Sequence, residues 1–386
     1  MYIVDHREAD AIRKVLLSGK LFRYGVGGEC ERFEKRWATY LGIEHACLCA
    51  SGTNALTAAL IGAGIGPGDE VVVPACTYMA TPVAVLAAGA IPVIVDIDDS
   101  ITLSPKALAA AIGPRTRAVI PVHMWGLPCD MAAIMRLARK HDLLVIEDAC
   151  QAVGGAFRGR ALGSIGHAGA FSFNYYKNIT AGEGGAVVTS DSRIMERARC
   201  VIDCCGFYWR GRRRDQRPFT CNGSRASELQ GAMLNVQLTR LPGMLRRMRS
   251  EKRRILRATR GTGLVPIRAN SLDDECGSHV MYTLPTPAAA DEFARRVGGF
   301  VTLKTGRHVY TQWDAVLAHN GAHHPALNPY KLKENRGCRM AYRKDMCAGS
   351  LDILARTVAI ATHPRHGAAE VSAIIQRIRA AAASIL

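Results

Sequence analysis

Short apolar runs alternate with amphipathic segments through the first half of the chain. Helical patterns with a polar and an apolar face lie between several of the runs, as over 54–63 and 131–141. Five runs have the length and composition of buried strands: 45–50, 70–73, 91–95, 118–122 and 143–147. Such an alternation predicts a mostly parallel sheet covered by helices on both faces.

A long, arginine-rich helical pattern over 225–260 follows this first half, and we expect Pro242 to interrupt it. Strand and helix patterns then resume and continue to the C-terminus. A chain of 386 residues is long enough for two domains. We therefore predict an α/β protein with a large domain at residues 1–240 and a smaller C-terminal α/β domain at 241–386.

Composition limits where the protein works and what it binds. No apolar run is long enough to span a bilayer, and the first residues lack the pattern of a cleavable signal peptide. Thirteen cysteines without a regular framework indicate reduced thiols, so we expect a cytoplasmic protein. No cysteine and histidine grouping has the spacing of a zinc site, and we expect no metal.

The net charge of +17 comes from arginines that crowd two segments. The group within 240–260 is typical of the solvated face of a long helix. The group within 210–217 predicts a loop that binds an anionic part of a substrate, with Arg212 and Arg213 as its candidate ligands. We do not expect nucleic-acid binding, because no recognised nucleic-acid module accompanies the charge.

Ligands of open parallel α/β sheets bind at the carboxyl ends of the strands, and four stretches of this chain fall there. In the first, Ser51, Gly52 and Thr53 form a small-residue turn between a strand and a helix. Its N–H groups and hydroxyls can hold a phosphate, although Thr53 could instead only cap the helix. In the second, Tyr78 follows a strand and can stack on a planar ring or pack in the core.

The third stretch ends the apolar run 143–146 with two acids, Glu147 and Asp148. A carboxylate there is costly to bury unless a cation faces it, and a protonated pyridine nitrogen is such a cation. We assign that role to Asp148, a hydrogen bond to a ring hydroxyl to Gln151, and a structural contact to Glu147. The alternative for Asp148 is an N-cap of a following helix.

The fourth stretch places one lysine, Lys177, between the aromatic run 171–176 and the glycine turn 182–185. A lysine on a short, buried loop has a lowered pKa, because burial disfavours its charged form. The free amine can then form a Schiff base with the aldehyde of pyridoxal phosphate. Ser172 can give a further hydroxyl to the phosphate. Most single lysines are only solvated surface charges, so the hypothesis depends on all four stretches together.

These stretches resemble the DegT-type sugar aminotransferases, pyridoxal phosphate enzymes of the aspartate aminotransferase fold. The likeness covers roughly residues 40–191 and includes VIEDACQAVGG and GAFSFNYYKNITAGEGGAVVTSD. It implies a homodimer with sites at the interface, the cofactor on Lys177, and Asp148 at the ring nitrogen. Members that remove water or deoxygenate sugars carry histidine where this chain has Lys177, so the lysine favours transamination.

The chain departs from the family pattern at the contact between subunits. The family has an asparagine, two residues before the arginine that corresponds to Arg225, which reaches the partner's phosphate. Here that place is Gly223, and Asn222 lies one residue away. Beyond Gly306 the substrate-binding segment of the family is not recognisable, so we expect an unusual acceptor.

We therefore predict an aminotransferase that moves an amino group from glutamate or glutamine to a keto-sugar or a related polyol ketone, in a biosynthetic pathway. Arg225 joins the two loop arginines as a candidate substrate-binding residue. Two alternatives remain open from the sequence. One is a pyridoxal phosphate-dependent sugar dehydratase or lyase, and the other is a non-enzymatic regulator that binds nucleic acid.

Overall fold

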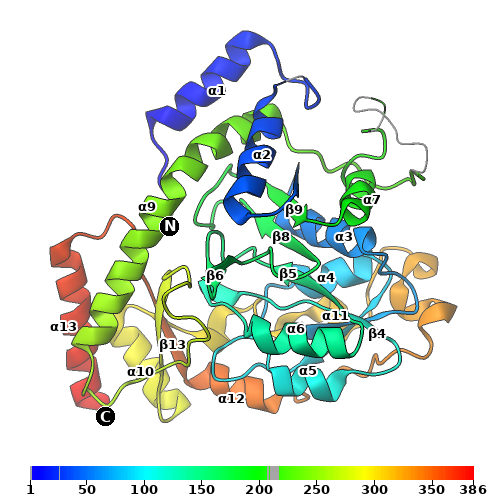
Figure 1. The fold of residues 1–386 in the computed structure, drawn as a ribbon. Coiled ribbons are helices and arrows are strands. Elements are labelled where there is room, and N and C mark those ends of the chain that lie inside the picture. The colour runs from blue at the N-terminus through cyan, green and yellow to red at the C-terminus, as the bar shows by residue number, and fades with distance from the viewer. Residues whose placement is uncertain (1, 26, 207, 209–216) are drawn as a thin grey trace.

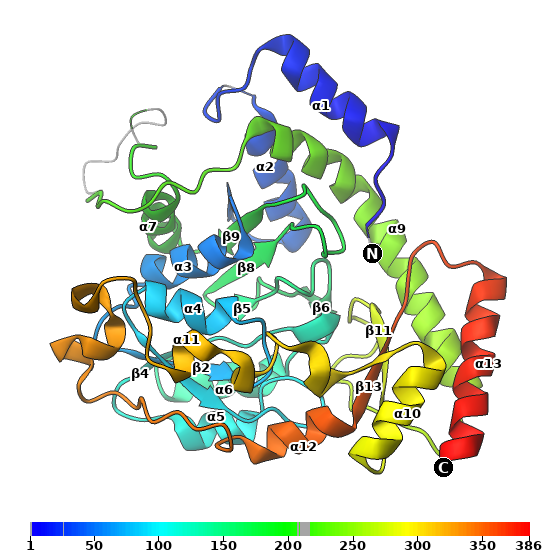
Figure 2. The same cartoon turned by 180° about the vertical axis from the view of Figure 1, so that it is seen from behind.

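The computed structural model describes residues 2–25, 27–206, 208 and 217–386. Its two main sheets are a seven-stranded one in the centre and a four-stranded one beside the C-terminal helix α13 (Ala368–Ile385) (Figures 1 and 2). This arrangement confirms the predicted α/β class with a second, smaller sheet. Within the described ranges, no helix is both long and apolar enough to cross a membrane.

The large sheet is parallel except for one strand. Its strand order is β1 (His45–Cys49), β9 (Gly185–Thr189), β8 (Ala168–Ser172), β5 (Leu144–Asp148), β4 (Thr116–Val119), β2 (Glu70–Pro74) and β3 (Ile91–Val95). β9 runs antiparallel to both of its neighbours, whereas β8, β5, β4, β2 and β3 pair in parallel. The carboxyl ends of β5 and β8 therefore lie at the same edge of the sheet, where ligands of such sheets bind.

Helices cover both faces of this sheet, which explains its near-continuous apolar strands. Val71 and Val73 of β2 belong to the core on one face, and Val72 between them belongs to the core on the other. The first core is shared with α3 (Gly52–Gly62), α4 (Ala80–Ala87) and α7 (Ser192–Ile202). The second is shared with α2 (Glu29–Leu41), α5 (Pro105–Ala111) and α6 (Met131–Lys140).

The smaller sheet is antiparallel throughout and has its own core. Its strand order is β10 (Val265–Pro266), β11 (His279–Thr283), β13 (Thr357–Ala361) and β12 (Phe300–Val301). Side chains of α10 (Pro287–Val297) and α13 fill this core, and α12 (Ala348–Arg356) leads into β13. A separate short hairpin pairs β6 (Ala156–Phe157) with β7 (Arg160–Ala161).

One helix, α9 (Glu228–Ala258), runs from the large sheet to the smaller one, with α1 (His6–Ser18) packed along its first half (Figure 1). It continues through Pro242, so the predicted interruption is wrong. Pro242 is exposed, while Leu241 and Leu245 beside it are buried, and their packing holds the helix together despite one lost backbone hydrogen bond. Residue 240, the predicted domain boundary, lies inside this continuous helix.

The segment between β12 and α12 crosses back onto the large sheet. The Tyr310 N–H donates to the Ala75 carbonyl, and the Thr77 N–H donates to the His308 carbonyl, both at 3.0 Å. These bonds place residues 307 and 308 beside the end of β2. Short helices build most of the segment: η2 (Thr302–Thr305), η3 (Tyr310–Gln312), α11 (Asp314–Leu317), η4 (Pro325–Leu327), η5 (Pro329–Lys331) and η6 (Lys333–Asn335).

Candidate active site

A cavity of about 590 Å³ opens where β5 and β8 end. Its size is typical of sites that bind small organic molecules. Eight residues from the four predicted stretches line it together: Ser51, Gly52, Thr53, Tyr78, Asp148, Gln151, Ser172 and Lys177. The structure therefore gathers in one place the side chains that the sequence distributes over more than a hundred positions.

One end of the cavity is formed by the N-terminus of α3. Ser51 caps this helix, since its Oγ accepts the Asn54 N–H at 3.2 Å, so the cap is not Thr53. A side chain at Gly52 would bring a Cβ within 2.8 Å of the Ser172 Cβ, and only glycine lets α3 and β8 approach this closely. First-turn N–H groups and the hydroxyls of Ser51, Thr53 and Ser172 together form an environment that favours a phosphate.

Asp148 lies on the floor of the cavity with only 5% of its surface exposed. Its Oδ2 accepts the Thr81 hydroxyl at 2.8 Å, and its Oδ1 accepts the Cys150 N–H at 3.1 Å. No arginine or lysine within the described ranges forms an ion pair with it. A buried carboxylate is costly without a cation, so this side chain suits a positively charged ring nitrogen. The alternative N-cap role is not seen, because no helix follows β5 directly.

Glu147, the neighbouring acid, makes the structural contact that we expected. Its carboxylate accepts the N–H groups of Gly163, Ile165 and Gly166 at 2.9, 2.6 and 2.6 Å. The His123 Nε2 donates to it at 3.0 Å, because Nδ1 of the same ring accepts the Cys129 N–H. Glu147 does not line the cavity, and its buried carboxylate holds the loop that precedes β8.

Lys177 lines the cavity from the loop between β8 and β9. Its backbone N–H donates to the Asn174 carbonyl at 3.0 Å, and the buried Asn178 side chain that follows donates to the Val153 carbonyl at 2.9 Å. The backbone on both sides is thus anchored. Lys177 itself is half-buried, and the outer side of its loop is open beside the exposed Tyr176.

Several lining residues were not predicted, and they come from segments distant in sequence. Trp125 sits at a φ of 51° and donates its N–H to the Gln151 Oε1 at 3.3 Å. Ser278, His279, Arg307 and His308 complete the wall from the C-terminal part of the chain. Trp125 falls within a stretch that resembles the family, whereas the other four carry no local signal, because only the crossing of their segments onto the large sheet brings them here.

The imidazole of His279 provides a pH-dependent contribution to stability. Burial lowers its pKa to about 4, and the positive charge of Lys252 acts in the same direction. The unfolded chain binds the proton near pH 6.5. The contribution of this group to the free energy of unfolding is therefore fully present above pH 6.5. It is lost as the pH falls from 6.5 towards 4, by about 3 kcal/mol in total. We expect urea denaturation of the wild type to show this loss and His279→Gln to flatten it.

A matched control for this prediction is His141→Gln, which replaces an exposed histidine at the end of α6. Carboxylates titrate in the same range in all three proteins, so the difference between variant and wild type isolates one group. Identical slopes of unfolding free energy against pH for His279→Gln and the wild type would contradict the assignment.

Of the three predicted substrate-binding arginines, Arg225 lies in the part of the chain that the structure describes, and it does not line the cavity. Arg212 and Arg213 lie outside the described residues. Arg225 donates to the Asp203 carboxylate at 3.2 Å, and the same carboxylate accepts the Tyr24 hydroxyl at 2.6 Å. The partner of Arg225 within the chain is therefore this acid, and the pair lies at the end of α7.

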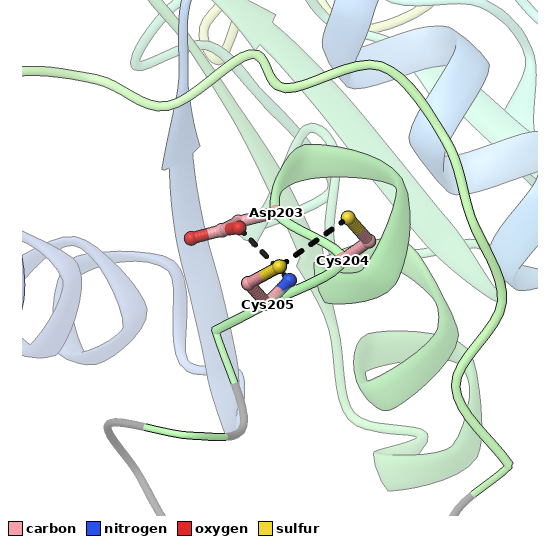
Figure 3. A group of neighbouring side chains, drawn as sticks. All are labelled: Asp203, Cys204 and Cys205. Atoms are coloured by element: carbon pink, nitrogen blue, oxygen red, sulfur yellow. Dashed lines mark hydrogen bonds between the residues drawn. The ribbon is translucent and has the colours of Figure 1, made fainter.

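Asp203 also belongs to a small group of possible metal ligands with Cys204 and Cys205 (Figure 3). The two sulfur atoms lie 3.8 Å apart, and the Asp203 Oδ1 accepts the Cys205 N–H at 3.0 Å. With Tyr24 and Arg225 on its other oxygen, this carboxylate already has a donor on each side. We therefore assign it no metal.

Comparisons with known proteins show which proteins this chain is similar to. A solved aminotransferase structure from Psychrobacter cryohalolentis matches with a TM-score of 0.82 and 27% identity, over 99% of this chain and 98% of that one. The dTDP-3-amino-3,4,6-trideoxy-alpha-D-glucose transaminase of Streptomyces venezuelae is 45% identical over 233 residues, which are 60% of this chain and 59% of the relative. A putative L-glutamine:3-amino-2,3-dideoxy-scyllo-inosose aminotransferase of Streptoalloteichus tenebrarius is 39% identical over 234 residues, 60% and 56% of the two chains.

The chain thus matches less than two thirds of the length of either curated relative. A family model, in contrast, matches almost the whole chain, from residue 3 to residue 379. That range includes the N-terminal helix, the cavity and the small sheet. The chain belongs to the DegT/DnrJ/EryC1/StrS aminotransferase family.

Proposed function

We propose that this protein is a pyridoxal phosphate-dependent aminotransferase that moves an amino group from glutamine or glutamate to a keto-sugar or related polyol ketone in a biosynthetic pathway. The observation that carries the proposal is the single cavity in which Lys177, Asp148 and the N-terminus of α3 meet. An amine, a buried acid and an anion-binding helix end are the three groups that this cofactor requires.

The lining residues fit pyridoxal phosphate part by part. Ser51, Gly52, Thr53 and Ser172 would hold its phosphate, since their N–H and hydroxyl groups surround the end of α3. Tyr78 would stack on the ring, Gln151 would bond the ring hydroxyl, and Asp148 would keep the ring nitrogen protonated. When bound, the cofactor supplies an aldehyde that takes up the amino group and a ring that withdraws electrons from the substrate carbon.

The protein side of the mechanism then follows from two side chains. In the resting enzyme, the Lys177 Nζ would hold the cofactor covalently. With the donor amine in its place, the same Nζ would be free to take the proton from the donor's α-carbon and to pass it to the cofactor carbon in the same half-reaction. In the opposite half-reaction it would carry a proton the other way. Asp148 would face the ring nitrogen, held in place by the Thr81 hydroxyl and the Cys150 N–H.

The similar proteins support the choice of substrates. The relative from Streptomyces venezuelae is named for an amino-sugar product, and the one from Streptoalloteichus tenebrarius is named for glutamine and an inosose. An inosose is a polyol ketone, and both names describe amino transfer. The lysine at position 177 supports the same reaction class over a sugar dehydratase.

The test uses glutamine with an isotope-labelled amino nitrogen, the protein loaded with pyridoxal phosphate, and a panel of keto-sugars and inososes. We expect the label to appear in an aminated product, with one keto acid released for each amine formed. Product formation without any amino donor would instead establish the dehydratase or lyase. Absence of the cofactor's absorbance band after loading would contradict both enzymatic functions.

The proposal includes a homodimer whose partner helps to complete the site. Tyr175 and Tyr176, next to Lys177, are 58% and 66% exposed, and Leu17 on α1 is 77% exposed. Uncovered apolar side chains of this kind favour a partner surface. Gly223, at the place of the family's asparagine, and the neighbouring Asn222 are both exposed and outside the cavity. Sedimentation velocity measures the dimer directly.

Two further parts of the proposal concern organisation and location. We place a large cofactor-binding domain at 1–240 and a small domain at 241–386, and the separate core of the four-stranded sheet supports this division. We place the protein in the cytoplasm, and its thirteen cysteines support that location because none is in a disulfide. Limited proteolysis tests the division into two domains, and cell fractionation tests the cytoplasmic location.

A further inference from the structure

Arg307 is an unusual cation in this molecule because it faces the cavity without an acidic partner. Two arginines elsewhere in the molecule are paired with acids: Arg240 bonds Asp5 and Glu8, and Arg339 bonds Glu70. Arg307 forms no ion pair with any described residue, although Glu183 lines the same cavity. A guanidinium that lines a binding cavity and forms no ion pair with the described residues is available for an anionic ligand.

The backbone fixes where this guanidinium can reach. The Arg307 carbonyl accepts the Met79 N–H at 3.0 Å and the Trp313 Nε1–H at 3.2 Å, so the residue is attached to both the large sheet and its own segment. Its Cζ lies 5.7 Å from the centre of the Tyr78 ring. This is cation–π distance, and it places the charge over the side chain that we assign to the cofactor ring.

The neighbouring imidazole does not compete for an anion. Burial, together with the smaller effects of the charges of Lys177 and Arg307, lowers the pKa of His308 to about 4. His308 is therefore neutral near pH 7, and it packs its ring 5.6 Å from that of Tyr78. Arg307 is therefore the cationic side chain on this wall of the cavity.

We propose that Arg307 binds the carboxylate of the amino-acid donor and thereby selects the donor. This inference rests on the proposed function. A guanidinium fork matches the two oxygens of a carboxylate, and the position beside Tyr78 is close to the reacting centre. The donor carries its α-carboxylate on the reacting carbon itself, whereas a keto-sugar acceptor carries no charge there. Arg307 should therefore act on the donor half of the reaction and not on the acceptor half.

The test compares four forms of the protein loaded with pyridoxal phosphate: wild type, Arg307→Gln, Arg307→Lys and Arg158→Gln. Arg158 is the matched control, because its guanidinium also lies over an aromatic ring, that of Phe157 at 5.1 Å, but outside the cavity. Calorimetry measures the binding of glutarate, a dicarboxylate without an amine that cannot react. Steady-state kinetics separately measure KM for glutamine and KM for the acceptor.

We expect Arg307→Gln to weaken glutarate binding roughly 10- to 100-fold, the range for one charge-assisted hydrogen-bonded pair. The KM for glutamine should rise by a similar factor, while the acceptor KM stays within about twofold. Arg307→Lys should retain part of the affinity, because it keeps the charge but loses the fork. Arg158→Gln should behave as wild type.

Two results would overturn the inference. One is unchanged glutarate affinity in Arg307→Gln. The other is a raised acceptor KM with competition by inorganic phosphate in the wild type alone, which would assign Arg307 to a phosphate of the acceptor. Either result leaves the proposed function standing if the wild type still transfers the amino group. Wild-type protein that shows no cofactor absorbance would instead defeat the proposed function itself.

Discussion

Lys177→Ala is expected to lose its aminotransferase activity by about 10³-fold or more and to lose the absorbance of covalently held pyridoxal phosphate. The side chain lines the cavity and is the amine assigned to both covalent attachment and proton transfer. Its loop is anchored through the backbone of Lys177 and the side chain of Asn178, so the variant should fold normally. Absorbance spectra, turnover with glutamine and a urea unfolding curve measure the three expectations.

Two companion variants separate the amine from its charge. Lys177→Arg keeps a positive group in the cavity but cannot supply a free amine, so it should be as inactive as the alanine variant. Lys106→Ala removes an exposed lysine from α5 and should leave turnover unchanged. Substantial activity in Lys177→Arg would mean that the side chain acts only as a charge, and it would refute the covalent role.

Asp148→Asn is expected to lower kcat roughly 10²- to 10³-fold, the size of effect seen when one buried charge-stabilising group is removed from an active site. The amide can still accept the Thr81 hydroxyl, so the site should keep its shape. The amide is neutral, however, so it cannot stabilise the positive charge of a protonated pyridine nitrogen as the carboxylate does. We therefore expect cofactor binding to persist with a changed absorbance spectrum, and the donor half-reaction, followed by stopped flow, to be slow.

The adjacent acid provides the contrast for this experiment. Glu147→Gln removes a buried carboxylate that accepts three backbone N–H groups and His123, so we expect a loss of about 3 kcal/mol of unfolding free energy. Per folded molecule its kcat should remain within a few-fold of wild type, because Glu147 is outside the cavity. If Glu147→Gln reduced kcat as much as Asp148→Asn, the two acids would not have separate roles.

The sequence was sufficient to predict the strands and the four stretches at their ends. Parallel strands buried on both faces are apolar along their whole length, so an acid such as Asp148 or a turn such as Ser51–Thr53 marks the end of a strand directly. All eight cofactor-binding residues assigned from those stretches line one cavity. Local pattern was informative there because each of these residues lies within a few positions of the strand that carries it.

Local patterns of apolar and polar residues could not predict the contacts between segments that are distant in sequence. Whether Pro242 breaks α9 depends on the buried side chains on either side of it, and the half-buried state of Lys177 depends on what covers its loop. The pairing of Arg225 with Asp203 joins residues that a pattern search treats as unrelated. The helix at Pro242, the exposure of Lys177 and the ion pair of Arg225 depend on side-chain packing and on which charged groups lie nearby in the folded protein.

By itself, the sequence determined the α/β architecture and the residues that lie at the ends of its strands. It did so because each strand or helix leaves its own pattern of apolar and polar residues in one continuous stretch of the chain. Only the tertiary structure decided that a segment from the C-terminal part returns to the end of β2 and adds Arg307 and His308 to the cavity. The backbone hydrogen bonds that hold it there join residues more than two hundred positions apart, and no local pattern encodes such a pairing.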